Sequence, residues 1–225
     1  MPASACQPNS CEDSVNDTSA LTPDARPGDV REALLKSTIK LFAEGGAKAA
    51  STRRIAKDAG VNEVTLFRHF GKKEELISSA MRWFSEQNRV EPLPAEPRDP
   101  ARELTDWCKE HHRRMYSLRT LIRACMADHL EHPDRNSPTL KLPVQVNNEL
   151  YEYLLRVRAS GLATGTWDAR SAANMLMGAL FSDAMGRDAM PERYPHAPDA
   201  AIEQYVALLL LAIVARETSD VRATA

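Results

Sequence analysis

Residues 51–76 read STRRIAKDAGVNEVTLFRHFGKKEEL, and this stretch ends one helix and begins another within a few residues. Ser51 or Thr52 can cap a short helix. That helix stops at Gly60, because glycine most easily adopts the left-handed conformation that ends helices. Asn62 then caps the next helix. The stretch therefore predicts two short helices joined by a tight turn.

The two short helices carry apolar residues on the sides that can face each other, namely Ile55, Ala56, Ala59, Val61 and Leu66. Packing through these residues leaves the outer face of residues 63–69 free. In a helix-turn-helix unit, the second helix enters the DNA major groove while the first crosses the backbone. Geometry alone also allows a plain helical corner that closes a bundle.

Charge favours the nucleic-acid interpretation locally but not for the whole chain. The 225 residues have a net charge of −2, which excludes a general polyanion binder. Residues 29–89, however, hold 12 Lys/Arg and 8 Asp/Glu. Within residues 48–73 there are seven basic and two acidic side chains. This local surplus is what phosphate neutralisation requires, although a solvated helix face would also carry it.

The chain has no sequence signal for export or for a membrane partner. Four cysteines, at positions 6, 11, 108 and 125, lack the spacing of a disulfide framework, which predicts a reduced, cytoplasmic protein. The first residues lack the basic and apolar regions of a secretory signal. The longest apolar run, Val206 to Ala215, is shorter than the roughly 18–20 residues that a membrane span needs.

Helical periodicity recurs along the chain without a convincing strand, which predicts an all-α fold. The first helix starts near Asp29 and ends at Gly45-Gly46, and the helix after the 51–76 turn runs to about Arg89. Further helices are expected at about 101–117, 119–131, 140–160, 168–187 and 199–217. Residues 1–28 and 218–225 are expected to be a disordered N-terminal tail and a flexible C-terminal tail.

The segment TRRIAKDAGVNEVTLFRHFGKKEELI, placed after a helix that ends in LFAEGG, resembles the DNA-binding domain of the TetR family of bacterial regulators. The resemblance covers about residues 30–80. It implies a helix-turn-helix DNA-binding domain over 29–75, followed by a helical ligand-binding and dimerisation domain over 76–217.

The resemblance also implies roles for individual residues on double-stranded DNA. Phosphate contacts are expected from Thr52, Arg53, His69 and Lys73, and base contacts from Glu63, Val64, Thr65 and Arg68. The family usually has tyrosine where this chain has Phe67, so Phe67 lacks the hydroxyl that would bond a phosphate and is expected to pack or stack against sugar.

The chemistry of three of these side chains suits particular bases. An arginine at 68 can fork onto guanine, and a valine at 64 can touch a thymine methyl group. A glutamate at 63 can accept a hydrogen bond from the cytosine amino group. Alternatively, Glu63 is a first-turn residue that favours the helix dipole.

The final helix is apolar nearly all round between Val206 and Val214, which predicts one face toward the core and one toward a second subunit. The resemblance implies a homodimer through the last two helices and a small-molecule cavity in the helical domain. A largely apolar effector is expected there. The candidate pocket residues are Trp107, His111, Met115, Met126, Tyr151, Met175 and Phe181. Most of these could equally be ordinary core residues.

Two cysteine–histidine pairs allow a metal hypothesis. Cys108 and His112, and Cys125 and His129, each lie one helical turn apart, as zinc ligands can. The alternative, buried cysteines with helix-end or surface histidines, is preferred, so neither a metal nor a cofactor is expected. Motifs of zinc hydrolases, phosphate loops and serine hydrolases are missing, which argues against an enzyme.

The sequence therefore predicts a ligand-responsive homodimeric transcriptional regulator, most simply a repressor, that binds a palindromic operator. A helical interaction protein or a metal-sensing protein is the alternative.

Overall fold

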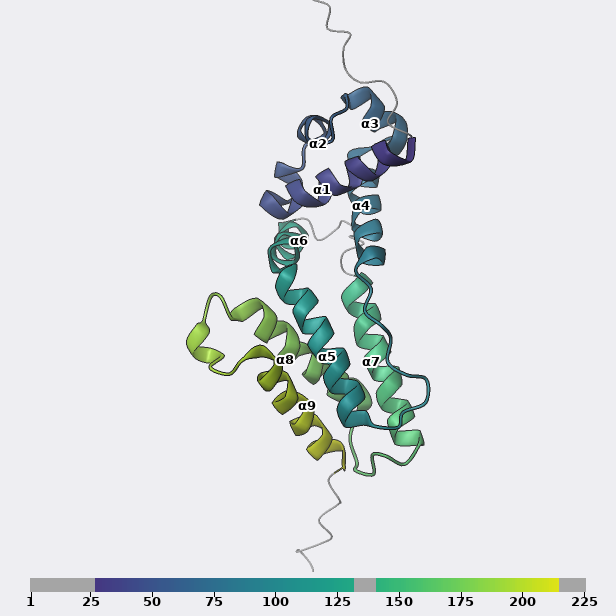
Figure 1. The fold of residues 1–225 in the computed structure, drawn as a ribbon, viewed down its shortest axis with the longest axis vertical. Coiled ribbons are helices and arrows are strands. Elements are labelled where there is room, and N and C mark those ends of the chain that lie inside the picture. The colour runs from purple at the N-terminus through teal and green to yellow at the C-terminus, as the bar shows by residue number, and fades with distance from the viewer. Residues whose placement is uncertain (1–26, 132–140, 215–225) are drawn as a thin grey trace, which may run out of the picture.

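The computed structural model describes residues 27–131 and 141–214, and these residues form an elongated all-helical molecule (Figure 1). The helices are α1 (Pro27–Ala49), α2 (Thr52–Asp58), α3 (Glu63–Phe70), α4 (Lys73–Gln87), α5 (Pro100–Ser117), α6 (Arg119–Glu131), α7 (Lys141–Ala159), α8 (Ala169–Gly186) and α9 (Pro198–Val214). The 3-10 helix η2 (Pro191–Arg193) lies between α8 and α9. The predicted fold class is confirmed. The predicted tails, apart from residues 27 and 28, lie outside the described residues.

Local capping explains where several helices begin. Asn62 accepts a hydrogen bond from the Thr65 backbone N–H at 2.8 Å, Asp99 from that of Arg102 at 3.2 Å, and Asp168 from that of Ser171 at 2.7 Å. Each carboxylate or amide oxygen satisfies a backbone donor that has no partner within its helix. The expected end of the first helix coincides with non-helical backbone at Gly45 and Gly46, after which a short helical turn continues to Ala49.

The turn between α2 and α3 has the geometry that the sequence predicts. Gly60 has a φ of 70°, in the left-handed region. The Val61 N–H donates to the Ala56 carbonyl at 2.9 Å, and the Gly60 N–H donates to the Lys57 carbonyl at 3.2 Å. This pair of bonds is a Schellman motif, which satisfies the last carbonyls of α2 and turns the chain at once into α3.

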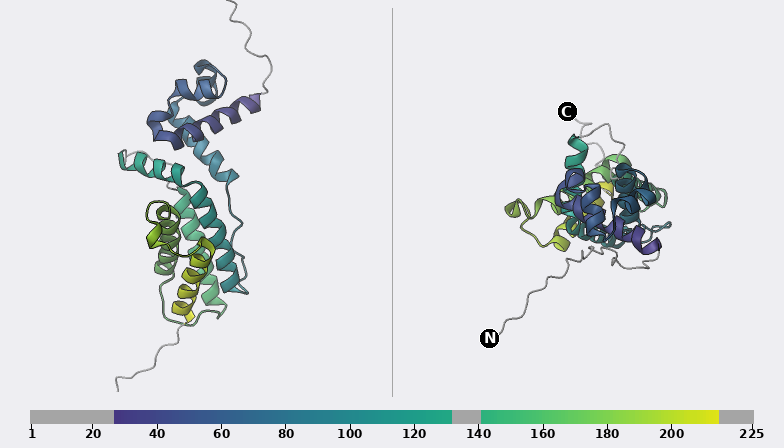
Figure 2. Two further views of the ribbon diagram at one scale, coloured as in Figure 1. Left: turned by 60° about the vertical axis from the view of Figure 1, so that its left-hand side comes forward. Right: turned by 90° about the horizontal axis from the view of Figure 1, so that it is seen from above.

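Two apolar cores divide the helices. The first core joins α1, α2, α3 and α4, and Leu121 of α6 also belongs to it. The second joins α5, α7, α8 and α9 around side chains such as Leu104, Leu154 and Leu180. Figure 1 and the left view of Figure 2 show α1–α3 at one end of the long axis and α7–α9 in the other half of the molecule. The first core reaches beyond residue 75, because α4 supplies Leu76, which is fully buried.

No helix within the described ranges is long and apolar enough to span a bilayer.

The first core depends on Leu66, which is fully buried on α3. We expect Leu66→Ala to lower the free energy of unfolding by about 2–5 kcal/mol, because it removes buried methyl groups and leaves a cavity. Val64, two residues earlier, is 76% exposed, so Val64→Ala should change stability by less than about 0.5 kcal/mol. Urea unfolding followed by circular dichroism measures both. Equal losses would show that α3 does not pack as described.

Candidate nucleic-acid interface

The outer face of α3 carries the side chains that the sequence singles out. Val64 is 76% and Phe67 44% exposed, although both are large apolar residues, and Arg68 is also exposed. Leu66 and Phe70 point the other way, into the first core. The helix thus buries one side and presents the other to solvent, as the helical period of 3.6 residues requires.

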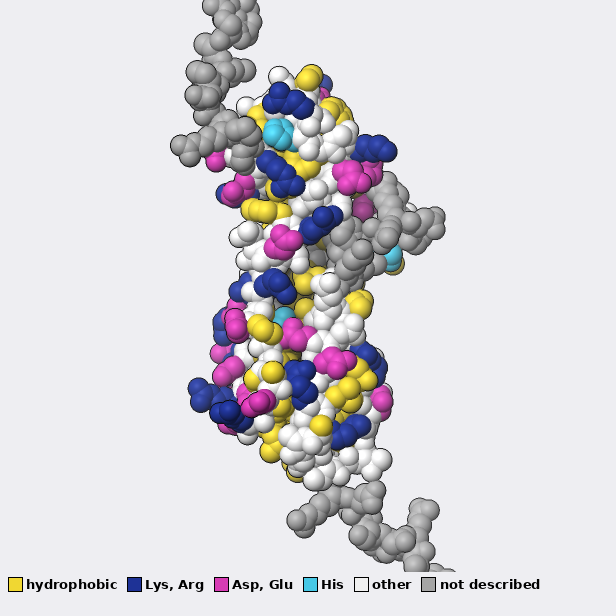
Figure 3. Space-filling view, turned by 90° about the vertical axis from the view of Figure 1, so that its right-hand side faces the viewer, with side chains coloured by type: hydrophobic (Ala, Val, Ile, Leu, Met, Phe, Trp, Pro, Cys, Tyr) yellow, Lys and Arg dark blue, Asp and Glu magenta, His cyan; other side chains and the backbone are white. Residues whose placement is uncertain are grey.

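Four basic side chains around this face are exposed and have no ion pair within residues 27–131 and 141–214: Arg53, Lys57, Arg68 and Lys72. Two other nearby cations are neutralised. Lys40 pairs with Asp58 at 2.6 Å, and Arg54 pairs with Glu44 at 3.1 Å. The net positive charge is therefore concentrated on α2, α3 and the turn after α3. Figure 3 shows basic side chains and a histidine at this end of the molecule.

Three of the predicted DNA-contacting residues, Thr52, Glu63 and Lys73, make internal hydrogen bonds. The Thr52 hydroxyl donates to Glu63 Oε2 at 2.8 Å, which joins the start of α2 to the start of α3. The Lys73 ammonium donates to the Ala47 carbonyl at 2.6 Å. An ammonium has three donors and a carboxylate has two oxygens, so both charged groups retain capacity for further bonds.

The remaining predicted DNA-contacting residues, Thr65 and His69, lie on α3. Thr65 and His69 are half-buried, and the His69 ring centroid lies 6.3 Å from that of Phe70. The structure thus brings all nine predicted residues onto α2, α3 and the first residue of α4. The sequence analysis did not single out Lys57 and Lys72. Their positive charge is the only signal that the sequence gives for them, since neither matches a DNA-contacting position of the family.

The predicted pocket residues are distributed more widely. The rings of Trp107 and His111 on α5 lie 4.0 Å apart, and Met115 and Tyr151 pack against the same second core. Burial, followed by the nearby Arg114, lowers the pKa of His111 to about 4, so this imidazole is neutral at pH 7.

Three other members of the pocket list occupy different environments. Phe181 on α8 is half-buried. Met126 on α6 and Met175 on α8 are 44% and 55% exposed.

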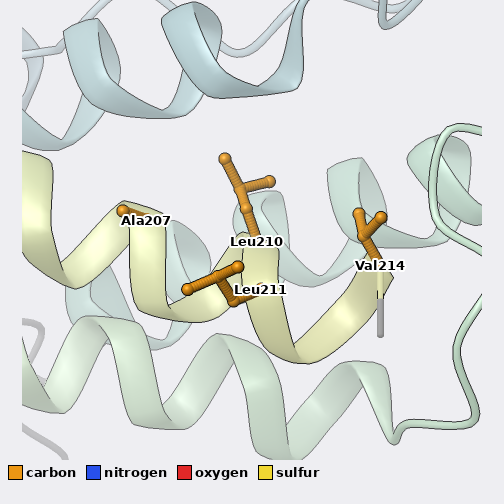
Figure 4. A pocket seen from close by; sticks show the side chains of 4 residues that line it. All are labelled: Ala207, Leu210, Leu211 and Val214. Carbon is orange, nitrogen blue, oxygen red and sulfur yellow. The ribbon is translucent and has the colours of Figure 1, made fainter. Parts of the chain in front are cut away.

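An open apolar hollow of about 550 Å³ lies along α9. Ala207, Leu210, Leu211 and Val214 line it (Figure 4). Leu211 is 70% exposed and Leu208, beside it, 63%. So much exposed aliphatic surface on one helix is typical of a protein interface.

The two cysteine–histidine pairs do not form a ligand set in the described part of the chain. No group of three or more His, Cys, Asp or Glu side chains there is arranged to hold a metal ion. Cys108 is fully buried, and burial raises its thiol pKa. His112 instead bonds Asp183 of α8 at 2.6 Å.

Asp183 is the centre of a buried polar cluster that sequence reasoning missed. It is fully buried and accepts hydrogen bonds from Arg187 at 2.6 and 2.9 Å and from the Tyr205 hydroxyl at 2.9 Å, besides its bond to His112. Burial opposes ionisation of Asp183, but the bonds from Arg187, Tyr205 and His112 hold its pKa below the ordinary value. The cluster joins α5, α8 and α9.

Comparison with known proteins agrees with this geometry. Residues 34–80 match the model of the family described as bacterial regulatory proteins, tetR family. The transcriptional repressor AcnR of Corynebacterium glutamicum is 28% identical over 162 residues, which are 62% of this chain and 85% of AcnR. The repressor KstR2 of Mycolicibacterium smegmatis is 35% identical over 66 residues, 28% of this chain and 32% of KstR2.

Solved structures show the same fold. A TetR-family regulator from Rhodococcus sp. aligns with a TM-score of 0.64 at 16% identity, over 83% of this chain and 99% of that one. FadR from Bacillus subtilis, solved with stearoyl-CoA, aligns with a TM-score of 0.55 at 19% identity, over 81% and 98%. Residues 34–80 thus resemble the TetR family in sequence, and the described chain resembles its solved structures in fold. The chain's named relatives are transcriptional repressors and not enzymes.

The Asp183 cluster gives a testable stability prediction. Asp183→Asn should lower the free energy of unfolding at pH 7 by about 3 kcal/mol, because it leaves the largely buried guanidinium of Arg187 without a charged acceptor. The folded-state pKa of Asp183 is depressed, so its stabilisation is complete above the unfolded pKa and is lost as pH falls through the folded pKa.

The difference in stability between the wild type and Asp183→Asn should therefore shrink as the pH falls below 3.8, the ordinary pKa of an aspartate. Chemical denaturation at a series of pH values measures this difference, and Asp106→Asn on an exposed part of α5 serves as the control. A difference that stays constant with pH would contradict the assignment of an ionised Asp183.

Proposed function

We propose that the chain is a homodimeric transcriptional repressor of the cytoplasm that binds palindromic duplex DNA through α2 and α3 and is released by a small-molecule effector. The observation that supports this most is the outer face of α3. It combines an exposed Arg68 with exposed Val64, and unpaired cations surround it. A solvated corner of a bundle has no need for exposed apolar side chains among unpaired cations.

On this proposal, the side chains divide into those that position DNA and those that read bases. Arg53, Lys57 and Lys72 neutralise phosphates, with His69 and the remaining donors of Lys73. Arg68 and Val64 read guanine and a thymine methyl group, respectively.

Glu63 and Phe67 have more limited roles in this scheme. The Thr52 hydroxyl already occupies Glu63 Oε2, which leaves Oε1 to accept from a cytosine amino group. Thr52 thereby orients Glu63 and also lies near the DNA backbone. Thr65 lies behind these readers, and Phe67 packs against sugar.

The second domain, assigned to residues 76–217, dimerises and senses the effector. Dimerisation through α8 and α9 would cover the open hollow and the exposed Leu208, Leu211 and Met175. It would also place two recognition helices about one turn of DNA apart, which suits a palindrome.

A largely apolar effector fits the side chains beside Trp107 and the neutral His111. The complex of the related FadR fold with stearoyl-CoA is an example of such a ligand in this architecture. Only a difference in effector affinity between the DNA-competent and DNA-incompetent states can release the operator.

Selection from a random duplex library tests the proposal. Several rounds of selection with the purified protein should enrich a palindromic sequence, bound by two protomers, that is preferred over its scramble by roughly 10³-fold or more. A folded dimer that enriches no sequence would instead support the alternative, a helical interaction protein that does not bind DNA.

Arg68 and Arg53 should affect DNA binding differently. Arg68→Ala is expected to cost about 1–3 kcal/mol on the selected site and much less on scrambled DNA, because it removes a base contact. Arg53→Ala should weaken both duplexes equally and reduce the salt slope by about one unit. Fluorescence anisotropy over a salt series measures both effects. An equal loss on both duplexes for Arg68→Ala would reject its role as a reader.

A substitution at Leu211 tests the proposed dimer interface. Leu211→Arg should leave the protomer folded, because this side chain is 70% exposed, but should place a cation in the apolar interface. Analytical ultracentrifugation should then find monomers at concentrations where the wild type is dimeric. Leu142→Arg, at a 40% exposed position on α7, is the matched control. A dimeric Leu211→Arg protein would place the interface elsewhere.

A further inference from the structure

Helix α6 belongs to both halves of the molecule. Leu121, on its first turn, is buried in the first core, and Ala124 and Cys125 pack against that core. At its far end, Glu131 pairs with Lys48 of α1 at 3.3 Å. Figure 2 shows α6 lying between α1 and the helices of the second core. Any displacement of α6 must therefore shift the first core, because buried side chains connect them.

One carboxylate fixes the beginning of α6 to the end of α8. Asp188 Oδ1 accepts from Arg123 Nη2 at 2.6 Å, and Asp188 Oδ2 accepts from Arg119 Nε and Arg123 Nη1, both at 3.1 Å. Arg123 also donates to the Met185 carbonyl of α8. These bonds, with that of Arg123 first, lower the pKa of Asp188 to about 2, so the group is ionised at any working pH.

Arg119 also connects α6 to α5. Arg119 donates to the Tyr116 carbonyl at 2.7 Å, and its guanidinium lies 4.3 Å from the Tyr116 ring centroid. Two guanidiniums and one carboxylate thus connect the ends of three helices. A bidentate arginine–carboxylate pair within a network has the geometry that gives surface ion pairs a measurable effect.

The turn that carries Asp188 is itself held in place. The Met190 and Ala189 N–H groups donate to the Gly186 carbonyl at 2.7 and 3.1 Å. The Tyr194 ring lies so close to Gly186 that a Cβ there would meet it at 2.6 Å, and the Tyr194 hydroxyl donates to the Ser182 carbonyl at 2.8 Å. Asp188 is therefore presented by an ordered turn and not by a loose loop.

We infer that Asp188 is a positioning residue for DNA binding, which fixes α6, and through it the first core, in one orientation relative to α8. The inference rests on the proposed function. In a dimer built on α8 and α9, the orientation of α6 relative to α8 sets the separation of the two recognition helices. Asp188 therefore controls which spacing of DNA half-sites the dimer accepts, although it lies far along the chain from α3.

The test compares duplexes that differ only in half-site spacing. The selected palindrome and a version with two base pairs inserted at its centre are titrated with wild-type protein, Asp188→Asn and Asp188→Glu. The wild type should strongly prefer the selected spacing. Asp188→Asn should reduce this preference by roughly tenfold, a typical size for coupling between sites. Asp188→Glu, which keeps the charge, should recover most of it.

Controls separate positioning from loss of fold. A variant that is merely less folded binds both duplexes less well and keeps their affinity ratio. Asp106→Asn makes the same chemical change on an ion pair within α5 and should keep the wild-type ratio. If Asp188→Asn does not fold, Arg123→Gln removes two of the three bonds from α6 to Asp188 and leaves that of Arg119.

The outcomes distinguish the inference from the proposed function. A wild-type spacing preference that Asp188→Asn, or Arg123→Gln in its place, leaves unchanged overturns the inference alone. A wild-type protein that binds all duplexes alike overturns the proposed function, and the inference with it.

Discussion

The immediate restart of the helix at residues 60–63 is the constraint on which the candidate DNA-binding surface depends. Gly60 takes the left-handed backbone that closes α2, and Asn62 caps the first turn of α3 at once. Because no spare residues separate the two helices, burying Ile55 and Leu66 in the first core fixes the direction in which the outer face of α3 points. The positions of Val64 and Arg68 follow from that geometry.

The sequence predicted the features that depend on local rules. The apolar period of a helix, its capping residue and the glycine that ends it all lie within a few residues of one another in sequence. The helix bounds and the turn between α2 and α3 could therefore be deduced from the sequence. The outward direction of Val64 follows from the burial of Leu66, because neighbouring positions on a short helix face different sides.

Features that depend on long-range contacts were not predictable in the same way. His112 and Asp183 are 71 residues apart in sequence, and Arg123 and Asp188 are 65 apart. A single sequence contains no signal that would identify either pair as a contact. For the same reason, His112 was considered a metal ligand with Cys108, whereas its partner is a carboxylate from another helix. The internal bond of Lys73 to Ala47 likewise depends on how α4 packs against α1.

The two halves of the molecule use charge differently. Around α3, exposed cations have no ion pair with any described residue, whereas Arg187 is paired with Asp183, and Arg119 and Arg123 with Asp188. The first arrangement suits a polyanionic partner, and the second holds helices together. A protein with a net charge of −2 can therefore carry a local cationic surface for DNA without general affinity for polyanions.

The salt dependence of DNA affinity tests the central claim most directly. For the selected duplex, the logarithm of the association constant should fall linearly with the logarithm of salt concentration, with a slope of about −0.9 for each phosphate that the dimer neutralises. The scrambled duplex should bind more weakly at every salt concentration. Affinity for the selected duplex that does not change with salt would contradict a DNA interface built on the unpaired cations of α2 and α3.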